Sequence, residues 1–168
     1  MTDLAGLLAD YGGYHRDSRN RVTHYFGVPA IAYALLIPAS LGAITVSGVE
    51  IGLQLIIVAL LTLFYLLLDL RLGLALAVLL ALLAGAAQAT TRLGVSGSLM
   101  VAGAVFVLGW TLQLIGHHLE GNRPALLTNL FQIVVAPIYL AAELSFALGL
   151  RPGLQAEIEK RLATAPAA

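Results

Sequence analysis

Long apolar runs separated by short polar breaks make up most of this chain. A helix needs about 20 apolar residues to cross the hydrocarbon core of a bilayer, which is roughly 30 Å thick. Only Asp69, Leu70 and Arg71 separate two of the runs, which predicts a tight helical hairpin. We therefore predict an all-α, polytopic membrane bundle with four to five transmembrane helices. The predicted spans lie at about residues 26–46, 51–70, 72–90, 98–116 and 126–150.

The two ends of the chain are more polar than the region between them. Residues 1–10 are acidic and weakly amphipathic, which favours a short amphipathic helix ahead of the first span. A second short polar helix is expected from Gln155 to Arg161, within a polar tail at 151–168. Pro137 falls inside the last apolar run, so this segment is predicted either to cross fully or to form a re-entrant element. The whole chain, 1–168, is expected to form a single membrane domain.

Composition supports a membrane protein and excludes several classes of function. Of the 168 residues, 60% are hydrophobic and 11% are charged, whereas soluble domains carry about 25% charged residues. The net charge of zero argues against a nucleic-acid partner. Because there is no cysteine, disulfides, thiolate metal sites and iron–sulfur clusters are excluded. The N-terminus lacks the basic and apolar regions of a cleaved signal peptide, so we expect the chain to enter the lipid bilayer through its own spans.

The four histidines of the chain lie in two polar clusters at the edges of the apolar runs. The first cluster, residues 14–29, contains His15 and His24, and the second, residues 110–126, contains His117 and His118. Imidazole is costly to place near lipid and is the commonest protein ligand for transition metals. We therefore predict one metal centre assembled from both clusters.

Arginine positions predict the orientation of the chain. Arg16, Arg19 and Arg21 place the first cluster on the cytoplasmic side by the positive-inside rule. Four predicted spans lie between the clusters, so the second cluster reaches the same face. A bacterial inner membrane is favoured over the endoplasmic reticulum because the chain is short and rich in alanine.

Helical spacing indicates which polar side chains share a face. Asp17 or Ser18 is a candidate helix N-cap, and a helix break there would let His15 and His24 both point inward. The second cluster has one polar face at helical spacing, formed by Trp110, Gln113, His117 and Glu120. The last run has a similar stripe, formed by Asn129, Gln132, Tyr139 and Glu143. For Gln54 and Asn129, plain interhelical hydrogen bonding competes evenly with a functional role.

The residue types limit which metals the site could bind but do not identify one. Imidazole suits zinc, copper, iron and nickel, whereas a site poor in carboxylates disfavours calcium and magnesium. The chain has no His-Glu-x-x-His zinc motif, no Gly-x-Ser-x-Gly nucleophile elbow, no phosphate loop and no dinucleotide fingerprint. This leaves a mononuclear, histidine-rich metal site at a membrane face, with oxygen chemistry as one reaction class.

Both histidine clusters carry a recognisable pattern. The first contains Tyr14, His15, Asn20, His24, Gly27 and Pro29. The second and its continuation contain Trp110, Gln113, Gly116, His117, Glu120, Arg123, Pro124, Ala125, Leu126, Asn129, Leu130, Gln132, Pro137 and Glu143. Together these motifs resemble the membrane 2-hydroxy fatty acid dioxygenase family, known from fungal sphingoid-base breakdown, and the resemblance covers essentially the whole chain.

The resemblance implies an Fe(II)-dependent enzyme of lipid α-oxidation. Such an enzyme converts a 2-hydroxy fatty acid and O2 to the acid one carbon shorter, with release of CO2. A 2-hydroxy acid can chelate iron through its carboxylate and hydroxyl, which brings both reactants to one centre. The acyl tail would lie between the spans, which accounts for a catalyst in a membrane.

The resemblance also implies roles for individual residues. His15, His24 and His117 are carried over as iron ligands, and His118 is either a fourth ligand or a substrate contact. Glu120 is either a carboxylate ligand or the ion-pair partner of Arg123. Six side chains are expected to support the ligands or to contact the substrate: Asn20, Gln113, Glu120, Arg123, Gln132 and Glu143.

Three other classes of protein compete with this hypothesis. A haem-binding redox protein would use histidine pairs as axial ligands. A small proton-coupled transporter would use the histidines with Glu143 and Asp69 as a relay. A non-catalytic membrane scaffold would require none of the histidines for metal binding.

Overall fold

The computed structural model describes residues 3–121 and 131–164, and almost all of its elements are helices. In chain order the helices are α1 (Leu4–Gly13), α2 (Ser18–Ser40), α3 (Leu53–Leu68), α4 (Leu70–Thr90), the 3-10 turn η1 (Thr91–Leu93), α5 (Gly94–Glu120), α6 (Gln132–Ala147) and α7 (Pro152–Thr164). The chain divides into two compact units. The first unit comprises Met1–Tyr25 and Gln113–Ala168, and the second comprises Phe26–Leu112.

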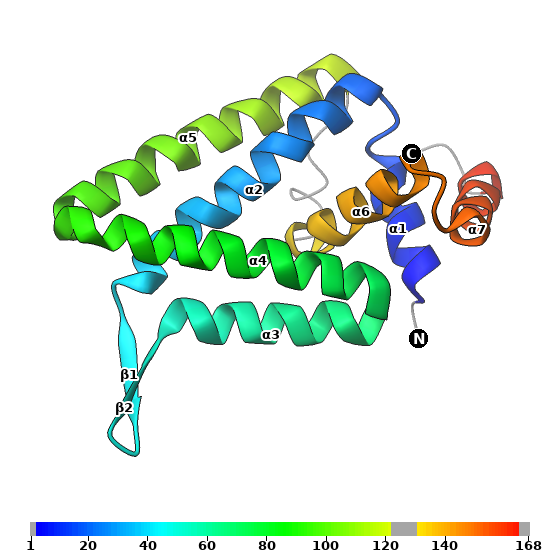
Figure 1. Cartoon of the computed structure of the whole chain (residues 1–168). Coiled ribbons are helices and arrows are strands. Elements are labelled where there is room, and N and C mark those ends of the chain that lie inside the picture. Colours follow the sequence, from blue (N-terminus) through cyan, green and yellow to red (C-terminus); the bar gives the residue numbers. More distant parts are fainter. Residues whose placement is uncertain (1–2, 122–130, 165–168) are drawn as a thin grey trace. The chain divides into compact units, whose positions relative to one another are not determined.

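In the second unit, α3 and α4 form the helical hairpin that the sequence predicts (Figure 1). The Asp69 carboxylate accepts the backbone N–H groups of Arg71 and Leu72, each at 3.0 Å, and so caps the N-terminus of α4. Gly73 lies so close to α3 that a Cβ there would be 2.7 Å from the backbone nitrogen of Leu66. The hairpin is therefore fixed by a cap and by a glycine that lets the two backbones approach.

The region between α2 and α3 departs from the prediction. Instead of continuing to residue 46, the helix of the first apolar run ends at Ser40, and two exposed strands follow, β1 (Ala43–Val46) and β2 (Val49–Gly52). They pair antiparallel through a turn in which Ser47 has φ 52° and Gly48 has φ 81°. Positive φ at both central residues is what a two-residue hairpin turn of this hand requires, and glycine adopts it without strain.

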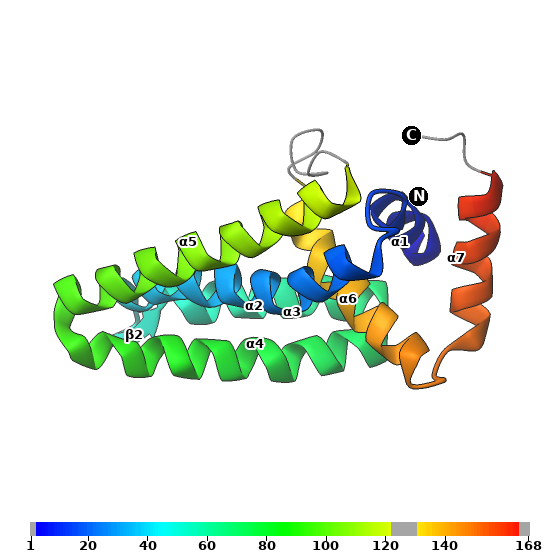
Figure 2. The same ribbon diagram turned by 90° about the horizontal axis from the view of Figure 1, so that it is seen from above.

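The other helices of the second unit pack through small and apolar side chains. The chain turns back at η1 from α4 into α5, and α2 runs beside α5 (Figure 2). Tyr33 Oη and Thr90 Oγ1 share a hydrogen bond of 2.6 Å, and Gln54 Nε2 donates to Gln88 Oε1 at 2.7 Å. Of the two roles considered for Gln54, the structure shows interhelical hydrogen bonding. The buried core consists of Leu36, Ile37, Ala87 and Ala102, flanked by Tyr33, Val58, Leu83 and Val101.

Helix lengths and exposed side chains indicate a membrane protein. Among the described residues, two helical stretches are long and apolar enough to cross a bilayer, namely Ser18–Ser40 and Leu70–Glu120, the latter joining α4, η1 and α5. A third is added if the bent pair of α6 and α7 counts as one span. The prediction of four to five spans is not confirmed. Many large apolar side chains of α3 and α4 are exposed, as expected of a surface that meets lipid: Leu55, Leu60, Leu63, Leu67, Leu74, Val78 and Leu82.

The first unit is organised around α1, which packs against α6 and α7. Asp3 caps α1 by accepting the N–H of Gly6 at 2.9 Å, and Arg161 of α7 donates to both Asp3 oxygens at 2.6 and 2.8 Å. These bonds from Arg161 hold the pKa of Asp3 below its usual value. The predicted N-terminal helix is therefore present, and the predicted tail helix is longer than expected. The core of this unit contains Leu8, Tyr11, Val135, Ile138, Tyr139, Ala142 and Ile158.

The close approach at Gly73 makes a prediction about stability. Gly73→Ala should destabilise the protein by about 1–3 kcal/mol, because the new methyl group meets α3 backbone that cannot move aside. Gly85→Ala in the same helix is the matched control, since a Cβ there has nothing within 4 Å. Alanine favours helix over glycine by about 1 kcal/mol, so the control should be neutral or stabilising. Denaturant unfolding in detergent measures both, and equal midpoints would contradict the assigned packing.

Candidate metal centre

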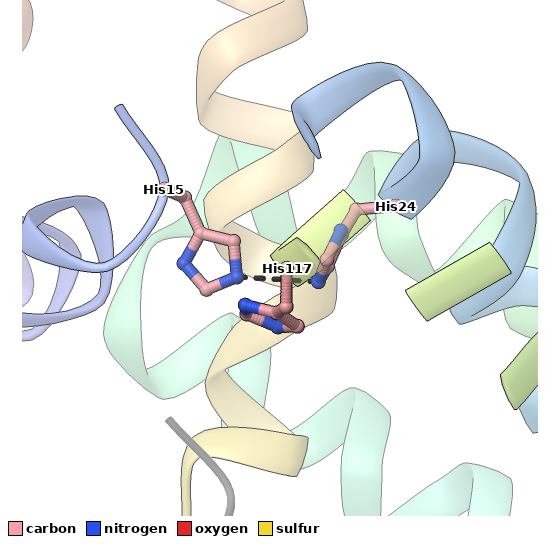
Figure 3. A group of neighbouring side chains, drawn as sticks. All are labelled: His15, His24 and His117. Atoms are coloured by element: carbon pink, nitrogen blue, oxygen red, sulfur yellow. Dashed lines mark hydrogen bonds between the residues drawn. The ribbon is translucent and has the colours of Figure 1, made fainter. Parts of the chain in front are cut away.

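Three histidines converge in the first unit, although they come from distant parts of the chain. His15 lies between α1 and α2, His24 lies in α2, and His117 lies in the last turn of α5 (Figure 3). Their side chains point toward one another, and one ring nitrogen from each lies within 4.8 Å of the others. All three are buried, with 2%, 2% and 5% of their surface exposed, in chain order.

Local structure accounts for the position of His15 beside His24. The Asp17 carboxylate accepts the backbone N–H of Arg19 at 2.8 Å, so Asp17 is the N-cap of α2. The helix thus begins after His15, and the chain ahead of it follows a different path. In one unbroken helix, residues nine apart would lie on opposite faces. The predicted helix break at Asp17 or Ser18 is confirmed.

The second ring nitrogens of His15 and His24 are held in the same way. His15 Nδ1 lies 2.9 Å from the carbonyl oxygen of Tyr11, and His24 Nδ1 lies 2.9 Å from that of Asn20. A carbonyl only accepts, so each Nδ1 must carry the proton and donate it. Each Nε2 then presents a lone pair, and the two Nε2 atoms face each other at 3.2 Å. In this tautomer of both neutral rings, neither Nε2 has a proton to donate across the contact drawn in Figure 3, and a cation could accept both lone pairs.

The spacing of these nitrogens suits a metal ion. Metal–nitrogen bonds of about 2.0–2.1 Å at angles between octahedral and tetrahedral place neighbouring ligand atoms about 2.8–3.4 Å apart. The 3.2 Å between His15 Nε2 and His24 Nε2 falls within this range. Burial lowers the pKa of His15 to about 4. The ring is therefore neutral at pH 7, which is the form that binds metals.

The third imidazole, that of His117, adds a buried ring nitrogen that has no hydrogen-bond partner among the described residues. The His117 ring centroid lies 5.1 Å from that of His15 and 5.0 Å from that of His24, both edge-on. His117 Nδ1 is buried and has no hydrogen-bond partner among the described residues. A buried polar atom left unsatisfied costs about 1–3 kcal/mol. The donor set as a whole, three neutral imidazoles with free lone pairs, fits zinc, copper, iron or nickel.

Two tyrosines that the sequence analysis did not assign to the site pack against His15. The Tyr11 ring stacks on the His15 ring with centroids 4.1 Å apart and planes 3° apart. Tyr139 lies 4.8 Å from Tyr11 and 6.0 Å from His15, centroid to centroid. The spacing of four residues between Tyr11 and His15 is the signal that would have found the first contact. Tyr139 reaches His15 only through the packing of α1 on α6.

Glu120 lies among hydrogen-bond donors and is not part of the histidine group. Its Oε1 accepts the backbone N–H groups of Arg16 and of Asp17, the latter at 2.9 Å. Its Oε2 accepts from the side-chain amide of Asn20. Both oxygens are thus engaged, which disfavours the expected role as a ligand. Arg123, the other expected partner of Glu120, lies outside the described residues.

His118 is separated from the three buried histidines. Its side chain is exposed, whereas that of His117 is buried. Successive residues on an α-helix point about 100° apart, so adjacent histidines in one helix cannot both face the same centre. The structure therefore does not bring His118 into the group.

Two glutamines present buried polar atoms near the ends of their helices. Gln113, buried on α5, lies four residues before His117 and so on the same helical face. Its Nε2 has no partner among the described residues, and neither does the Oε1 of Gln132, at the start of α6. Both atoms are available to a bound molecule. Asn129, which the sequence places on the same stripe as Gln132, lies outside the described residues.

Glu143 supports the site through an arginine. Arg21 Nε lies 3.3 Å from Glu143 Oε2, and Arg21 Nη1 donates to the backbone carbonyl oxygens of His15 and Arg16 at 3.2 and 3.0 Å. Glu143 thus has the partner that its position on an apolar helix requires. Because Arg21 is engaged in this way, it braces the segment that carries His15 rather than offering a free charge to a ligand.

A separate cavity of about 300 Å³ lies among α1, α6 and α7. Tyr139 lines it and also contacts His15, so this ring stands between the cavity and the histidines. Its other lining residues are Gly12, Glu143, Phe146, Ala147, Gln155, Ile158, Glu159 and Leu162. The two carboxylates in this wall disfavour an anionic headgroup.

Apolar helices and three buried, converging imidazoles indicate a helical membrane protein with a histidine-lined candidate metal centre. The chain belongs to the 2-hydroxy-palmitic acid dioxygenase Mpo1-like family, whose pattern matches residues 1–148. It is similar to the 2-hydroxy-palmitic acid dioxygenase MPO1 of Saccharomyces cerevisiae, with 33% identity over 168 residues that cover 96% of this chain and 91% of the yeast protein. The family predicted from the two motifs is therefore confirmed. No solved structure matches the chain.

The contrast between adjacent histidines makes a prediction about metal binding. His117→Ala should lower the affinity for Co(II) by at least about 100-fold, because it removes one of three nitrogen donors. His118→Ala should retain the affinity of the unmodified protein, because its side chain is exposed. Isothermal titration of the purified protein in detergent measures both. Equal losses in the two variants would contradict the three-histidine assignment.

A glycine next to His117 makes a second prediction about the site. A Cβ at Gly116 would run into Thr23 Oγ1 and Asn20 Oδ1. Gly116→Ala should therefore force α5 away from α2 and weaken Co(II) binding by about tenfold or more, as changes behind metal ligands do. Gly103→Ala in the same helix has nothing within 4 Å of its Cβ and serves as the control. Unchanged affinity in both variants would show that this close approach is not required.

Proposed function

We propose that this protein is an Fe(II)-dependent dioxygenase that converts a 2-hydroxy fatty acid and O2 to the fatty acid one carbon shorter, CO2 and water. Membership of the dioxygenase family and the named activity of the yeast relative support this reaction class. The observation that carries the proposal is the buried group of His15, His24 and His117. Three neutral protein ligands leave coordination positions open for a substrate, as catalytic metal sites require.

The overall reaction balances without a further reductant. The bond between carbons 1 and 2 of the substrate breaks, carbon 1 leaves as CO2, and carbon 2 becomes the new carboxyl carbon. The substrate supplies all the electrons that O2 takes up, so neither 2-oxoglutarate nor a nicotinamide is needed. Iron held by the three histidines would supply a centre at which a chelating 2-hydroxy acid and O2 meet.

The side chains around the histidines have separate tasks in this proposal. Tyr11 and Asn20 hold the Nδ1 protons of the two histidines through their carbonyl oxygens, so that both Nε2 lone pairs stay aimed inward. Gln113 offers its buried Nε2–H to the substrate carboxylate or hydroxyl, and Gln132 offers a buried acceptor. Burial of the three rings keeps bulk water away from the reacting groups.

The membrane supplies the substrate in this scheme. Exposed apolar side chains of the helices would contact lipid, and a fatty acid dissolved in the bilayer can reach the site without crossing water. We propose that the histidines lie on the cytoplasmic side of a bacterial inner membrane.

The geometry favours this proposal over a haem protein. Axial ligands on opposite sides of one iron stand about 4 Å apart, twice a metal–nitrogen bond of about 2.0–2.1 Å. His15 Nε2 and His24 Nε2 are 3.2 Å apart, which suits neighbouring ligands instead. Family membership favours an enzyme over a proton-coupled transporter or a scaffold.

The proposal is tested with anaerobically purified protein in detergent, loaded with Fe(II), given 2-hydroxypalmitate and then exposed to O2. Pentadecanoic acid and CO2 should appear in equal amounts, and His24→Ala should lower the rate by at least about 100-fold because a ligand is lost. His118→Ala is the control and should keep most of the rate. Iron-loaded protein that forms no pentadecanoic acid from either enantiomer would refute the proposed reaction.

A further inference from the structure

Glu120 connects the three chain segments that carry the histidines. It lies on α5 three residues after His117, at the C-terminal end of the helix. Its Oε1 accepts the N–H of Arg16, the residue that follows His15, and the N–H of Asp17. Its Oε2 accepts from the Asn20 side chain, and the backbone carbonyl of the same Asn20 holds the Nδ1 proton of His24. One carboxylate of α5, the helix that carries His117, thus contacts the backbone next to His15 and the residue that orients His24.

The charge of Glu120 suits this place. The N–H groups of Arg16 and Asp17 lie just ahead of α2, where the helix leaves unpaired donors and a partial positive charge. A carboxylate with several such donors makes charge-assisted hydrogen bonds, which are roughly twice as strong as neutral ones. At the end of α5 the same carboxylate is unfavourably placed with respect to that helix. Its position is therefore explained by α2 and not by its own helix.

We propose that Glu120 is the positioning residue of the metal centre, and that it fixes His15 and His24 in register with His117 without contacting the metal. This inference rests on the metal site of the proposed function, but it concerns the geometry of the ligands and not the identity of the substrate. Asn20 links Glu120 to His24. Its side chain donates to Glu120 while its main chain orients His24.

Exchanging the hydrogen-bond donor and acceptor tests the contact between Asn20 and Glu120 without changing the size of either side chain. Asn20→Asp sets two carboxylates against each other, and Glu120→Gln sets an amide donor against the Asn20 donor. In the double variant N20D/E120Q, the amide introduced at position 120 can donate to the carboxylate introduced at position 20, while the amide oxygen still accepts from the two backbone N–H groups. Glu50→Gln, at an exposed position in β2, is the control for the loss of one carboxylate.

Co(II) affinity and the visible spectrum of bound Co(II) are the first readouts. Each single variant should bind about 10–100-fold more weakly and show an altered spectrum, because the ligands lose their support. The double variant should recover to within about fivefold of the unmodified protein, since the two sites are directly coupled. A double variant that binds no better than the weaker single variant would overturn the proposal, and so would unchanged binding in both single variants.

Hydrogen exchange of the metal-free protein is the second readout. Glu120→Ala should speed the exchange of the Arg16 and Asp17 amides, whereas Glu50→Gln should leave them unchanged. Unchanged exchange in Glu120→Ala would also overturn the proposal. Because these readouts use no substrate, they stay interpretable if the iron-loaded protein makes no pentadecanoic acid. That outcome would refute the dioxygenase reaction and leave the role of Glu120 to be judged on metal affinity.

Discussion

A histidine can bind a metal through Nε2 only while its other ring nitrogen keeps the proton, and this requirement organises the site. In both His15 and His24, a carbonyl oxygen four residues earlier accepts the Nδ1 proton. The carbonyl of Tyr11 does so for His15 and that of Asn20 for His24. The main chain of two helices thus fixes the tautomer of both rings. The contacts of Glu120 join the start of α2 to the end of α5, which carries the third ring.

Charged side chains brace the chain segments that carry the histidines. Arg21 holds the carbonyl of His15 and is itself held by Glu143, while Glu120 holds the backbone N–H groups that follow His15. This arrangement leaves the three histidines buried, while the charged side chains beside them are engaged in contacts of their own. A glycine is also needed beside the histidines. At Gly116, only the lack of a Cβ allows α5 to lie against Asn20.

The sequence could predict features that depend on residues close together in the chain. The break at Asp17 follows from helix capping, and it is present. The partners of Glu120 were missed because they lie about a hundred residues away in the chain. The strands at 43–52 were missed because apolar residues in β1 continue the pattern of a span, while the turn at Ser47 and Gly48 decides otherwise. The predicted span count is not confirmed for a related reason, since α3 has only 16 residues.

The order of the ligands along the chain has a consequence for biosynthesis. His15 and His24 emerge from the ribosome early, whereas His117 follows only after every residue of the second unit has been made. A nascent or truncated chain therefore offers two of the three imidazoles and cannot form the full donor set. In the proposed function, a metal ion that needs all three imidazoles would be bound only after α5 has been made.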